Sequence, residues 1–342
     1  MKQRNFDSTP QVRSEFLPVS SRARSYRHTP YSKTPRVRNL TGRAEETIES
    51  TEQAASNLKG LVNKTWRIYK VSPLFQFDYS PSSLRLYSRL LKAQLEAKET
   101  QGYGVMVGSS NSIKTCFSVY EGLTSLKGDS EAVEIKIQVA SKTGGEKEVF
   151  CGILCCVEGS EDALDLLADS KSFTQLPVLL TKGQVSFTYK VLDFIQTKFD
   201  CVATPLVFTP LELGWMISMW AGILNEERPN RSVQLVYSVP LKQLQSITYN
   251  IKQESAHKIW NCIHDQSSDE MNVEEVTAFL GSLERHFHTI FGIDLAHLCL
   301  KEIATPPAAA HTSGKLKIFS TAMIHKILRH ITCLSQEALQ RS

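Results

Sequence analysis

Three histidines, His286, His288 and His297, are the best candidates for metal ligands in the sequence. Imidazole is a common zinc ligand, but the ligands of a site must converge on one ion. The apolar periodicity predicts a helix over 273–291, in which residues two positions apart point about 200° away from each other. His286 and His288 therefore cannot bind one ion together, and we predict no metal site and no cofactor.

The glycines between Gly102 and Gly108 resemble a dinucleotide-binding loop only superficially. They follow a predicted helix and precede a predicted strand, whereas a phosphate-binding loop needs a strand, the glycines and then a helix N-terminus. The sequence also contains no Walker-type loop, no Gly-x-Ser-x-Gly elbow and no Cys-x-x-Cys pair. We therefore predict that the protein is not an enzyme, has no catalytic residues and has no small-molecule substrate.

The composition is that of a globular protein of 342 residues, which is enough for two domains. Hydrophobic residues make up 42% and charged residues 22% of the chain, so a sizeable core can form. No apolar run approaches the roughly 18–20 residues of a membrane span, and we expect neither a signal peptide nor membrane contact. We expect the eight cysteines to be reduced and to pack mostly as small apolar residues.

The charge of the chain is concentrated at its N-terminus. Residues 1–44 carry ten basic and two acidic residues, a net charge of +8, which leaves −4 for the remainder. Residues 1–50 also lack apolar periodicity, so we predict a disordered basic tail that contacts DNA or another polyanion. The tail residues that we expect to contact DNA are Arg22, Arg24, Arg27, Arg36 and Arg38. Three Thr-Pro pairs are candidate phosphorylation sites, at Thr9, Thr29 and Thr34.

The remainder of the sequence predicts an α+β fold, in which helices pack on a curved, largely antiparallel sheet. We divide it into an N-terminal region, 51–206, and a C-terminal region, 207–342. Apolar periodicity of the helical kind predicts helices over 51–64, 83–100, 187–199, 210–224, 254–264 and 273–291, and a last one that ends near 339. Short β-branched runs predict strands over 66–71, 105–107, 113–120, 132–140, 149–157, 233–239 and 246–251.

The segments 295–303 and 315–319 look like two strands of a long hairpin, with a loop of small residues through Ala310. Lys315 and Lys317 alternate with Leu316 and Ile318, so one face of the second strand is charged and the other is apolar. Lysine commonly protects an exposed edge strand, and an exposed edge can accept a strand from a partner. The alternative is an ordinary edge strand that packs on the final helix.

Several long strings of residues resemble the centromere protein L family. The strings occur in order from about residue 60 to residue 320, and the tail has no matching motif. They are Trp66-x-x-Tyr69, Ser72-Pro73-Leu74-Phe75-Gln76-Phe77, Leu84-x-x-Tyr87-Ser88-Arg89-Leu90-Leu91, Phe199-Asp200-Cys201, Pro205-Leu206, Leu213-Gly214-Trp215-Met216-x-x-Met219-Trp220, Ser238-Val239-Pro240, His286-Phe287-His288 and Ala310-His311-Thr312-x-Gly314-Lys315-x-Lys317-Ile318.

This resemblance implies a non-enzymatic subunit of the constitutive inner kinetochore, located in the nucleus at the centromere. It implies pairing with a centromere protein N-like subunit through C-terminal β structure, contact with other inner-kinetochore subunits, and attachment to centromeric chromatin. With the resemblance, we expect Leu316, Ile318 and Phe319 to bind the partner, and Lys315 and Lys317 to face DNA. The alternative function is a free-standing regulator that binds nucleic acid through the basic tail.

Overall fold

The computed structural model of the chain describes residues 52–100, 113–124, 130–140, 145–157, 172–221, 232–241, 243–264 and 271–341. Every described residue belongs to one compact unit, Glu45–Ser342. The predicted tail, the glycine run after residue 101 and the strand expected at 105–107 lie outside the described residues.

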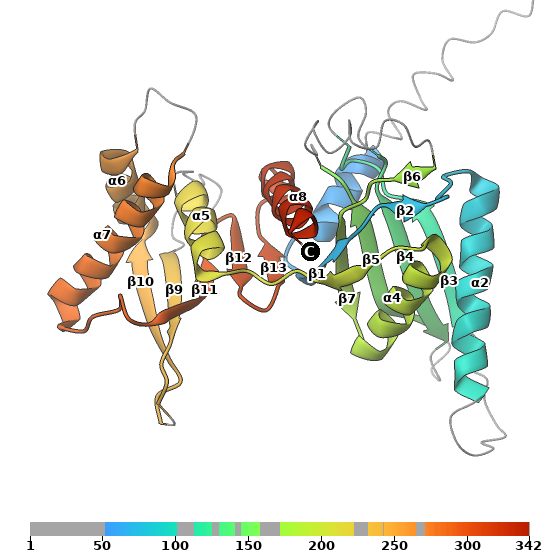
Figure 1. Cartoon of the computed structure of the whole chain (residues 1–342), viewed down its shortest axis with the longest axis horizontal. Coiled ribbons are helices and arrows are strands. Elements are labelled where there is room, and N and C mark those ends of the chain that lie inside the picture. Colours follow the sequence, from blue (N-terminus) through green and yellow to red (C-terminus); the bar gives the residue numbers. More distant parts are fainter. Residues whose placement is uncertain are drawn as a thin grey trace, which may run out of the picture. The chain divides into compact units, whose positions relative to one another are not determined.

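The described residues form helices and strands that mostly match those expected from the sequence (Figure 1). A first helical segment spans 52–61. The other helices are α2 (Pro81–Thr100), α4 (Val185–Phe199), α5 (Pro210–Ala221), α6 (Gln253–Ile263), α7 (Val273–Phe291) and α8 (Ile324–Gln340). The strands are β1 (Thr65–Val71), β2 (Leu74–Phe75), β3 (Ile113–Val119), β4 (Val133–Ala140), β5 (Glu146–Cys155), β6 (Phe173–Thr174), β7 (Val178–Gly183), β8 (Ala203–Pro205), β9 (Ser232–Ser238), β10 (Ser246–Lys252), β11 (Cys299–Ala304), β12 (Ala308–His311) and β13 (Lys315–Ile318).

One large antiparallel sheet connects the two predicted regions. Its strands lie in the order β10-β9-β11-β12-β13-β1-β7-β5-β4-β3, and β8 also pairs with β1. A separate two-stranded sheet contains β2 and β6. The large sheet therefore crosses residue 206, because β1 from the first region pairs with β13 from the second. The mixed α+β fold with a largely antiparallel sheet is confirmed, whereas the division at residue 206 stays a prediction.

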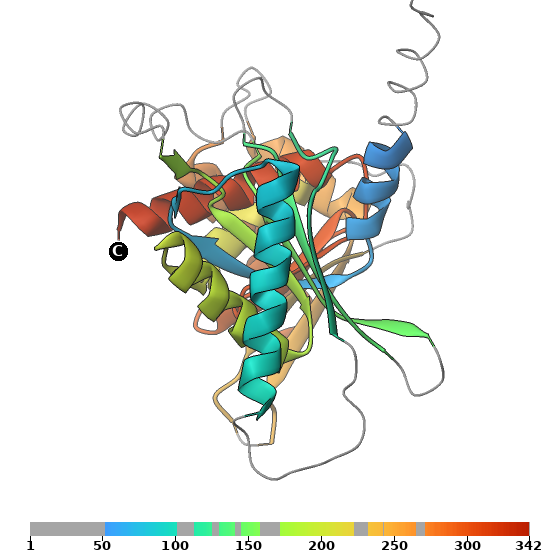
Figure 2. The same ribbon diagram turned by 90° about the vertical axis from the view of Figure 1, so that its right-hand side faces the viewer.

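Strand β1 is apolar on both faces, as its sequence predicts, and each face belongs to a different core. Trp66 and Ile68 pack in a core that includes residues of α5, α6, α7 and α8. Tyr69 and Val71 pack on the opposite face, in a core that includes residues of α2 and α4. Figure 2 shows α2 lying across the strands that it covers. A strand covered on both sides needs apolar residues at consecutive positions, because successive side chains point to opposite faces.

Two expectations about the C-terminal strands are wrong. The small-residue segment around Ala310 is the strand β12, which pairs with β11 on one side and with β13 on the other. Strand β13 is also not an edge, because it lies between β12 and β1. No strand was expected over Val178–Gly183. This segment is β7, which pairs with both β1 and β5.

Candidate functional site

The strand predicted to bind a partner is an interior strand of the chain's own sheet. Leu316 lies opposite Trp66 of β1 and opposite Ala310 of β12. Leu316 and Ile318 are fully buried in the core on the helix-covered face. Both side chains and both edges of β13 are therefore already occupied, and the prediction that Leu316 and Ile318 form an exposed seam for a partner is wrong. Phe319 follows the strand and is half-buried.

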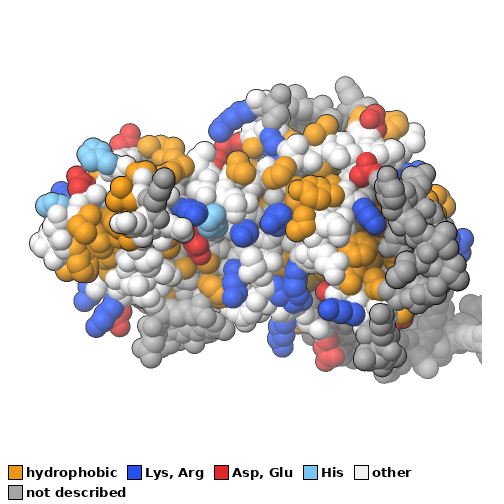
Figure 3. All heavy atoms as spheres, turned by 90° about the horizontal axis from the view of Figure 1, so that it is seen from below, with side chains coloured by type: hydrophobic (Ala, Val, Ile, Leu, Met, Phe, Trp, Pro, Cys, Tyr) orange, Lys and Arg blue, Asp and Glu red, His pale blue; other side chains and the backbone are white. Residues whose placement is uncertain are grey.

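The two lysines of β13 lie on the opposite face of the sheet. No described helix covers that face at β13. Lys315 is exposed and lies between Arg67 of β1 and His311 of β12. Lys317 is half-buried, and its ammonium group lies 5.4 Å from the centre of the Phe319 ring. Figure 3 shows several Lys and Arg side chains, with a histidine, in the middle of the face seen from below. The tail arginines and the three Thr-Pro threonines predicted as sites lie outside the described residues.

The sheet ends at β3 on one side, and α2 covers the backbone edge of this strand. The Ser88 hydroxyl of α2 accepts a hydrogen bond from the Phe117 backbone N–H, at 2.9 Å. The Thr115 hydroxyl donates to the Ser88 backbone carbonyl, at 2.6 Å. The first bond occupies a backbone N–H that would otherwise be free to pair with another strand, and the second joins a β3 side chain to the α2 backbone. Strand β3 is therefore an edge partly protected by α2, which packs along it.

The sheet ends at β10 on the other side, which is the leftmost strand in Figure 1. Hydrogen-bonded and non-hydrogen-bonded residue pairs alternate in an antiparallel ladder. The Val239 N–H donates to the Gln245 carbonyl, so the odd-numbered residues of β10 bond to β9. The backbone groups of Thr248 and Asn250 then point outward. No described residue pairs with them, so β10 presents an open edge.

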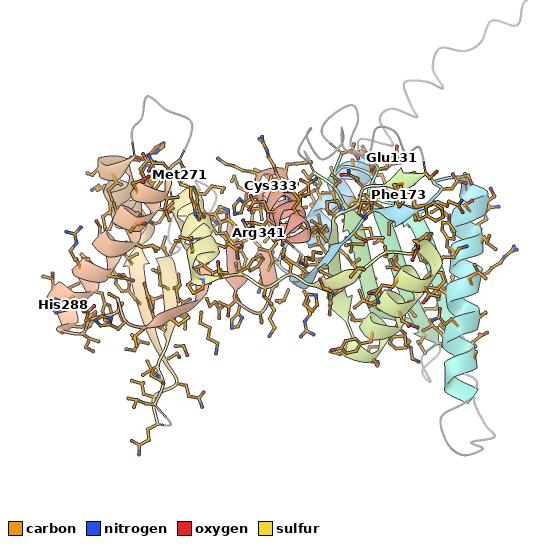
Figure 4. The ribbon with its side chains drawn as sticks, in the orientation of Figure 1. Glu131, Phe173, Met271, His288, Cys333 and Arg341 are labelled. Carbon is orange, nitrogen blue, oxygen red and sulfur yellow. The ribbon has the colours of Figure 1, made fainter. Side chains whose placement is uncertain are left out.

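Apolar side chains of α7 surround this edge. The Tyr249 ring of β10 packs edge-on against Phe287, at 5.1 Å between ring centres, and Phe287 packs against Phe291 at 4.6 Å. Phe291 and its neighbours Ile290 and Ile293 are exposed by 58%, 56% and 46%. Figure 4 labels His288 at this end of α7. An open strand edge beside exposed apolar side chains is the geometry that strand addition requires.

The candidate metal ligands are used in other ways. The Nδ1 atom of His286 lies 2.6 Å from the hydroxyl oxygen of Tyr249. His288, two residues later on α7, borders a solvent-open groove of about 850 Å³ with Glu284 and Asp294. Among the described residues, no three His, Cys, Asp or Glu side chains are close enough to hold a metal ion.

The buried cysteines are poor nucleophiles at neutral pH. Burial, and to a smaller extent the carboxylate of Glu134, raises the pKa of Cys151 to about 12. Burial also raises the pKa of Cys201, to about 11. All eight cysteines are free thiols, as the sequence predicts, and Cys155 and Cys156 are buried as well. Since the thiolate is the reactive form, the buried cysteines act as packing residues.

The β10 edge was not expected, because nothing local distinguishes it. The strand 246–251 itself was expected. Which strand lies outermost depends on pairings between segments that are far apart in the sequence. The exposed Phe291 and Ile293, at the end of the predicted helix and two residues beyond it, are the signal that could have indicated a surface for a partner.

The sequence model of the family described as centromere protein L matches residues 60–340. The chain belongs to the centromere protein L family. Centromere protein L of the frog Xenopus tropicalis is 31% identical over 336 residues, which cover 96% of this chain and 94% of the relative. The mouse protein of the same name is 36% identical and covers 75% of this chain and 78% of the relative.

A more distant relative carries a functional name. The fission yeast protein, Inner kinetochore subunit fta1, is 24% identical over 274 residues, which cover 76% of this chain and 90% of the relative. The centromere protein L match begins inside the first described helical segment and ends in α8. It therefore includes every strand of the large sheet, with both of its edges. None of the helices among the described residues is long and apolar enough to cross a bilayer.

Proposed function

We propose that the protein is a non-enzymatic scaffold subunit of the inner kinetochore that pairs with a centromere protein N-like subunit through the β10 edge. Membership of the centromere protein L family supports the inner kinetochore role and a location at the centromere in the nucleus. Contact with other inner-kinetochore subunits follows from this role.

The observation that carries the pairing proposal is the difference between the two ends of the sheet. Strand β3 is partly protected by Ser88, whereas β10 keeps outward backbone groups at Thr248 and Asn250. A partner strand at β10 gains backbone hydrogen bonds, and the exposed Phe291 offers an apolar contact next to them. The proposed partner seam lies at the end of the C-terminal β structure, four strands away from Leu316 along the sheet order.

Replacing Thr248 by proline tests the seam. Proline removes an outward N–H and leaves the bonds of β10 to β9 in place, because those bonds come from odd-numbered residues. We expect the Thr248→Pro chain, coexpressed with the centromere protein N-like subunit of the same species, to lose co-elution on size exclusion. Thr248→Ala keeps the N–H and is the matched control, which should co-elute like the unchanged chain.

A second variant separates loss of pairing from loss of folding. Phe291→Asp places a charge in the apolar rim of the proposed seam, and its exposed position leaves the core intact. We expect normal helix content and weakened pairing. If folded Thr248→Pro and Phe291→Asp chains both still co-elute with the partner, the β10 seam is wrong.

We also propose that the assembled pair contacts centromeric DNA through the basic tail and the uncovered face of the sheet that carries Lys315 and Lys317. The supporting observations are the net charge of +8 in residues 1–44 and the exposure of Lys315 beside Arg67. Such contacts are made to backbone phosphates and do not depend on base sequence. Replacing both lysines by Glu should weaken DNA binding of the complex and spare pairing.

A further inference from the structure

A groove runs between helix α4 and strand β1, at the opposite side of β13 from the β10 seam. Two adjoining cavities form it, of about 130 Å³ and about 400 Å³. The smaller cavity is bordered by Thr65 and Arg67 of β1 and by Val185 of α4. The larger is bordered by Arg67, by Tyr69 of β1 and by residues further along α4. The cavities therefore follow one another along both elements, and Arg67 borders both.

The smaller cavity is suited to an anion. Two cations of its lining, Arg67 and Lys315, lie directly opposite each other in the sheet, so their side chains share one face. Lys182 also lines the cavity, but it follows the Arg67 partner Thr181 on β7, so its side chain projects to the other face. None of the lining residues is a carboxylate, and neither Arg67 nor Lys315 forms an ion pair with a described carboxylate. The carboxylate of Asp193 borders the larger cavity, which Arg67 also borders.

A few hydrogen-bond donors border the same space. Of the three threonines in the lining, Thr181 and Thr188 already donate their hydroxyl hydrogens to the backbone carbonyls of Arg67 and Gln184. The Thr65 hydroxyl is the remaining threonine donor of the lining. The first turn of α4 also borders it, and Gln184, the N-cap residue of α4, makes no side-chain hydrogen bond to that turn. A cavity of about 130 Å³ has room for about four water molecules, and so for a phosphoryl group with its oxygens.

The larger cavity is suited to apolar side chains. Its lining combines the exposed Tyr189 and Pro205 with the buried Leu192, and it also includes the polar Asp193 and Gln196. Tyr189 is 63% exposed, with no described residue covering it. Between Val185 and Gln196 the groove follows about 16 Å of helix, the length of about five residues of extended peptide.

We propose that this groove binds a phosphorylated peptide of a partner protein, with the phosphoserine or phosphothreonine in the Arg67 cavity and an apolar neighbour against Tyr189. Arginine clusters bind phosphomonoesters through paired, charge-assisted hydrogen bonds. A phosphomonoester carries nearly two negative charges on a projecting group and so matches a narrow cavity with two cations on one face. Duplex DNA presents single charges along a broad surface and has no apolar group for the Tyr189 side. The inference does not depend on pairing at β10, and it is an alternative to the DNA contact proposed above for Lys315.

The test measures binding of fluorescent peptide libraries to the full chain co-purified with its partner, at physiological salt. One library has a fixed central phosphothreonine with random flanking residues, and the second has threonine instead. We expect the phosphorylated library to bind at least about tenfold more tightly, the effect of one charge-assisted hydrogen bond or more. Inorganic phosphate should compete with it, and sequencing of the bound peptides should show apolar residues on one side.

Variants distinguish the two parts of the groove. Arg67→Gln and Lys315→Gln should each weaken binding of the phosphorylated library by about tenfold and leave the unphosphorylated library unchanged. Tyr189→Ala should remove the apolar preference while phosphate still competes. Lys301→Gln is the matched control, because Lys301 is an exposed cation of the same sheet that lines neither cavity.

Two results would overturn the proposal. One is equal binding of the two libraries. The other is that Arg67→Gln and Lys301→Gln lose the same amount of affinity for random-sequence duplex DNA while their peptide binding does not change. That result would assign the cations of this face to DNA. Thermal melting of each variant identifies any loss that comes from unfolding.

Discussion

His330 is a half-buried basic group on α8 whose surroundings disfavour its charged form. Burial lowers the pKa of His330 to about 4, and the carboxylate of Glu212 opposes this shift only in part. Its Nε2 atom is buried and has no hydrogen-bond partner among the described residues. The native protein therefore keeps this imidazole neutral over the whole physiological range.

We predict that this residue makes the fold sensitive to mild acid. The unfolded chain binds a proton at His330 below about pH 6.5, whereas the folded chain does so only near pH 4, so the free energy of unfolding decreases as the pH falls between these values. The full loss is about 3 kcal/mol. Urea unfolding of His330→Gln should show a flatter dependence between pH 7 and 5 than the unchanged chain. His288→Gln, at an exposed position, should keep the dependence, and equal curves for all three chains would contradict the prediction.

The turn between β12 and β13 is the element that closes the sheet against β1. The Gly314 carbonyl accepts a hydrogen bond from the Ile68 N–H, at 2.9 Å, and the Ile68 carbonyl accepts one from the Leu206 N–H, at 3.0 Å. Gly314 has a φ of +73°, and a Cβ atom on it would lie 1.9 Å from the Leu206 carbonyl oxygen. Only glycine can occupy this position while the three segments remain in contact.

Gly314→Ala should therefore be strongly destabilising, by about 3 kcal/mol or more, because it adds both a steric clash and backbone strain. The matched control is Gly281→Ala, where nothing lies within 4 Å of the added Cβ in the interior of α7. That change should stabilise the chain by about 0.5–1 kcal/mol through helix propensity. Urea midpoints followed by circular dichroism measure both effects, and similar midpoints for the two variants would refute this reading of the turn.

The elements that the sequence predicted well have strong periodicity and clear ends. The helix α7 was expected over 273–291 and has these bounds, with a capping box between Asn272 and Glu275 at its start and Gly292 after its end. Strand β12 was missed because alanines have low strand propensity. Ala308 and Ala310 are small because their face is buried in the core that also contains residues of α5.

The position of β13 could not be predicted from its own residues. Its Lys-Leu-Lys-Ile pattern is typical of an edge, yet both of its neighbours are strands of this chain. The alternation arises instead because helices cover only one face of the sheet at this point. A polar face and an open edge produce the same local pattern, and only the distant pairing with β1 distinguishes them. The sequence therefore predicted the fold class and most elements but mistook an interior strand for an exposed edge.

At the scale of the whole molecule, the chain has a basic segment and a body of opposite net charge. Deleting residues 1–44 removes a net charge of +8, and we predict that it flattens the salt dependence of DNA binding. The reason is that each neutralised phosphate releases a counterion and adds to the slope. Filter binding between low and physiological salt measures this slope.

A control for that experiment keeps the composition of the segment and changes its order. A chain with a shuffled 1–44 sequence should retain the original slope, because the contacts are electrostatic and not sequence-specific. Pairing with the partner should be the same for all three chains. A slope that does not change on deletion would show that DNA is bound elsewhere.

Strand β13 also determines when the protein can finish folding. It lies near the end of the chain but in the middle of the sheet, where it pairs with residues of β1 made roughly 250 positions earlier. During synthesis, one edge of β1 stays unpaired until the ribosome has almost completed the chain. Trp66 and Ile68 lack part of their core for the same time. Such a nascent chain exposes apolar surface for most of its translation. A premature stop before β13 should consequently yield a chain that needs chaperones or is degraded, instead of a shorter working subunit.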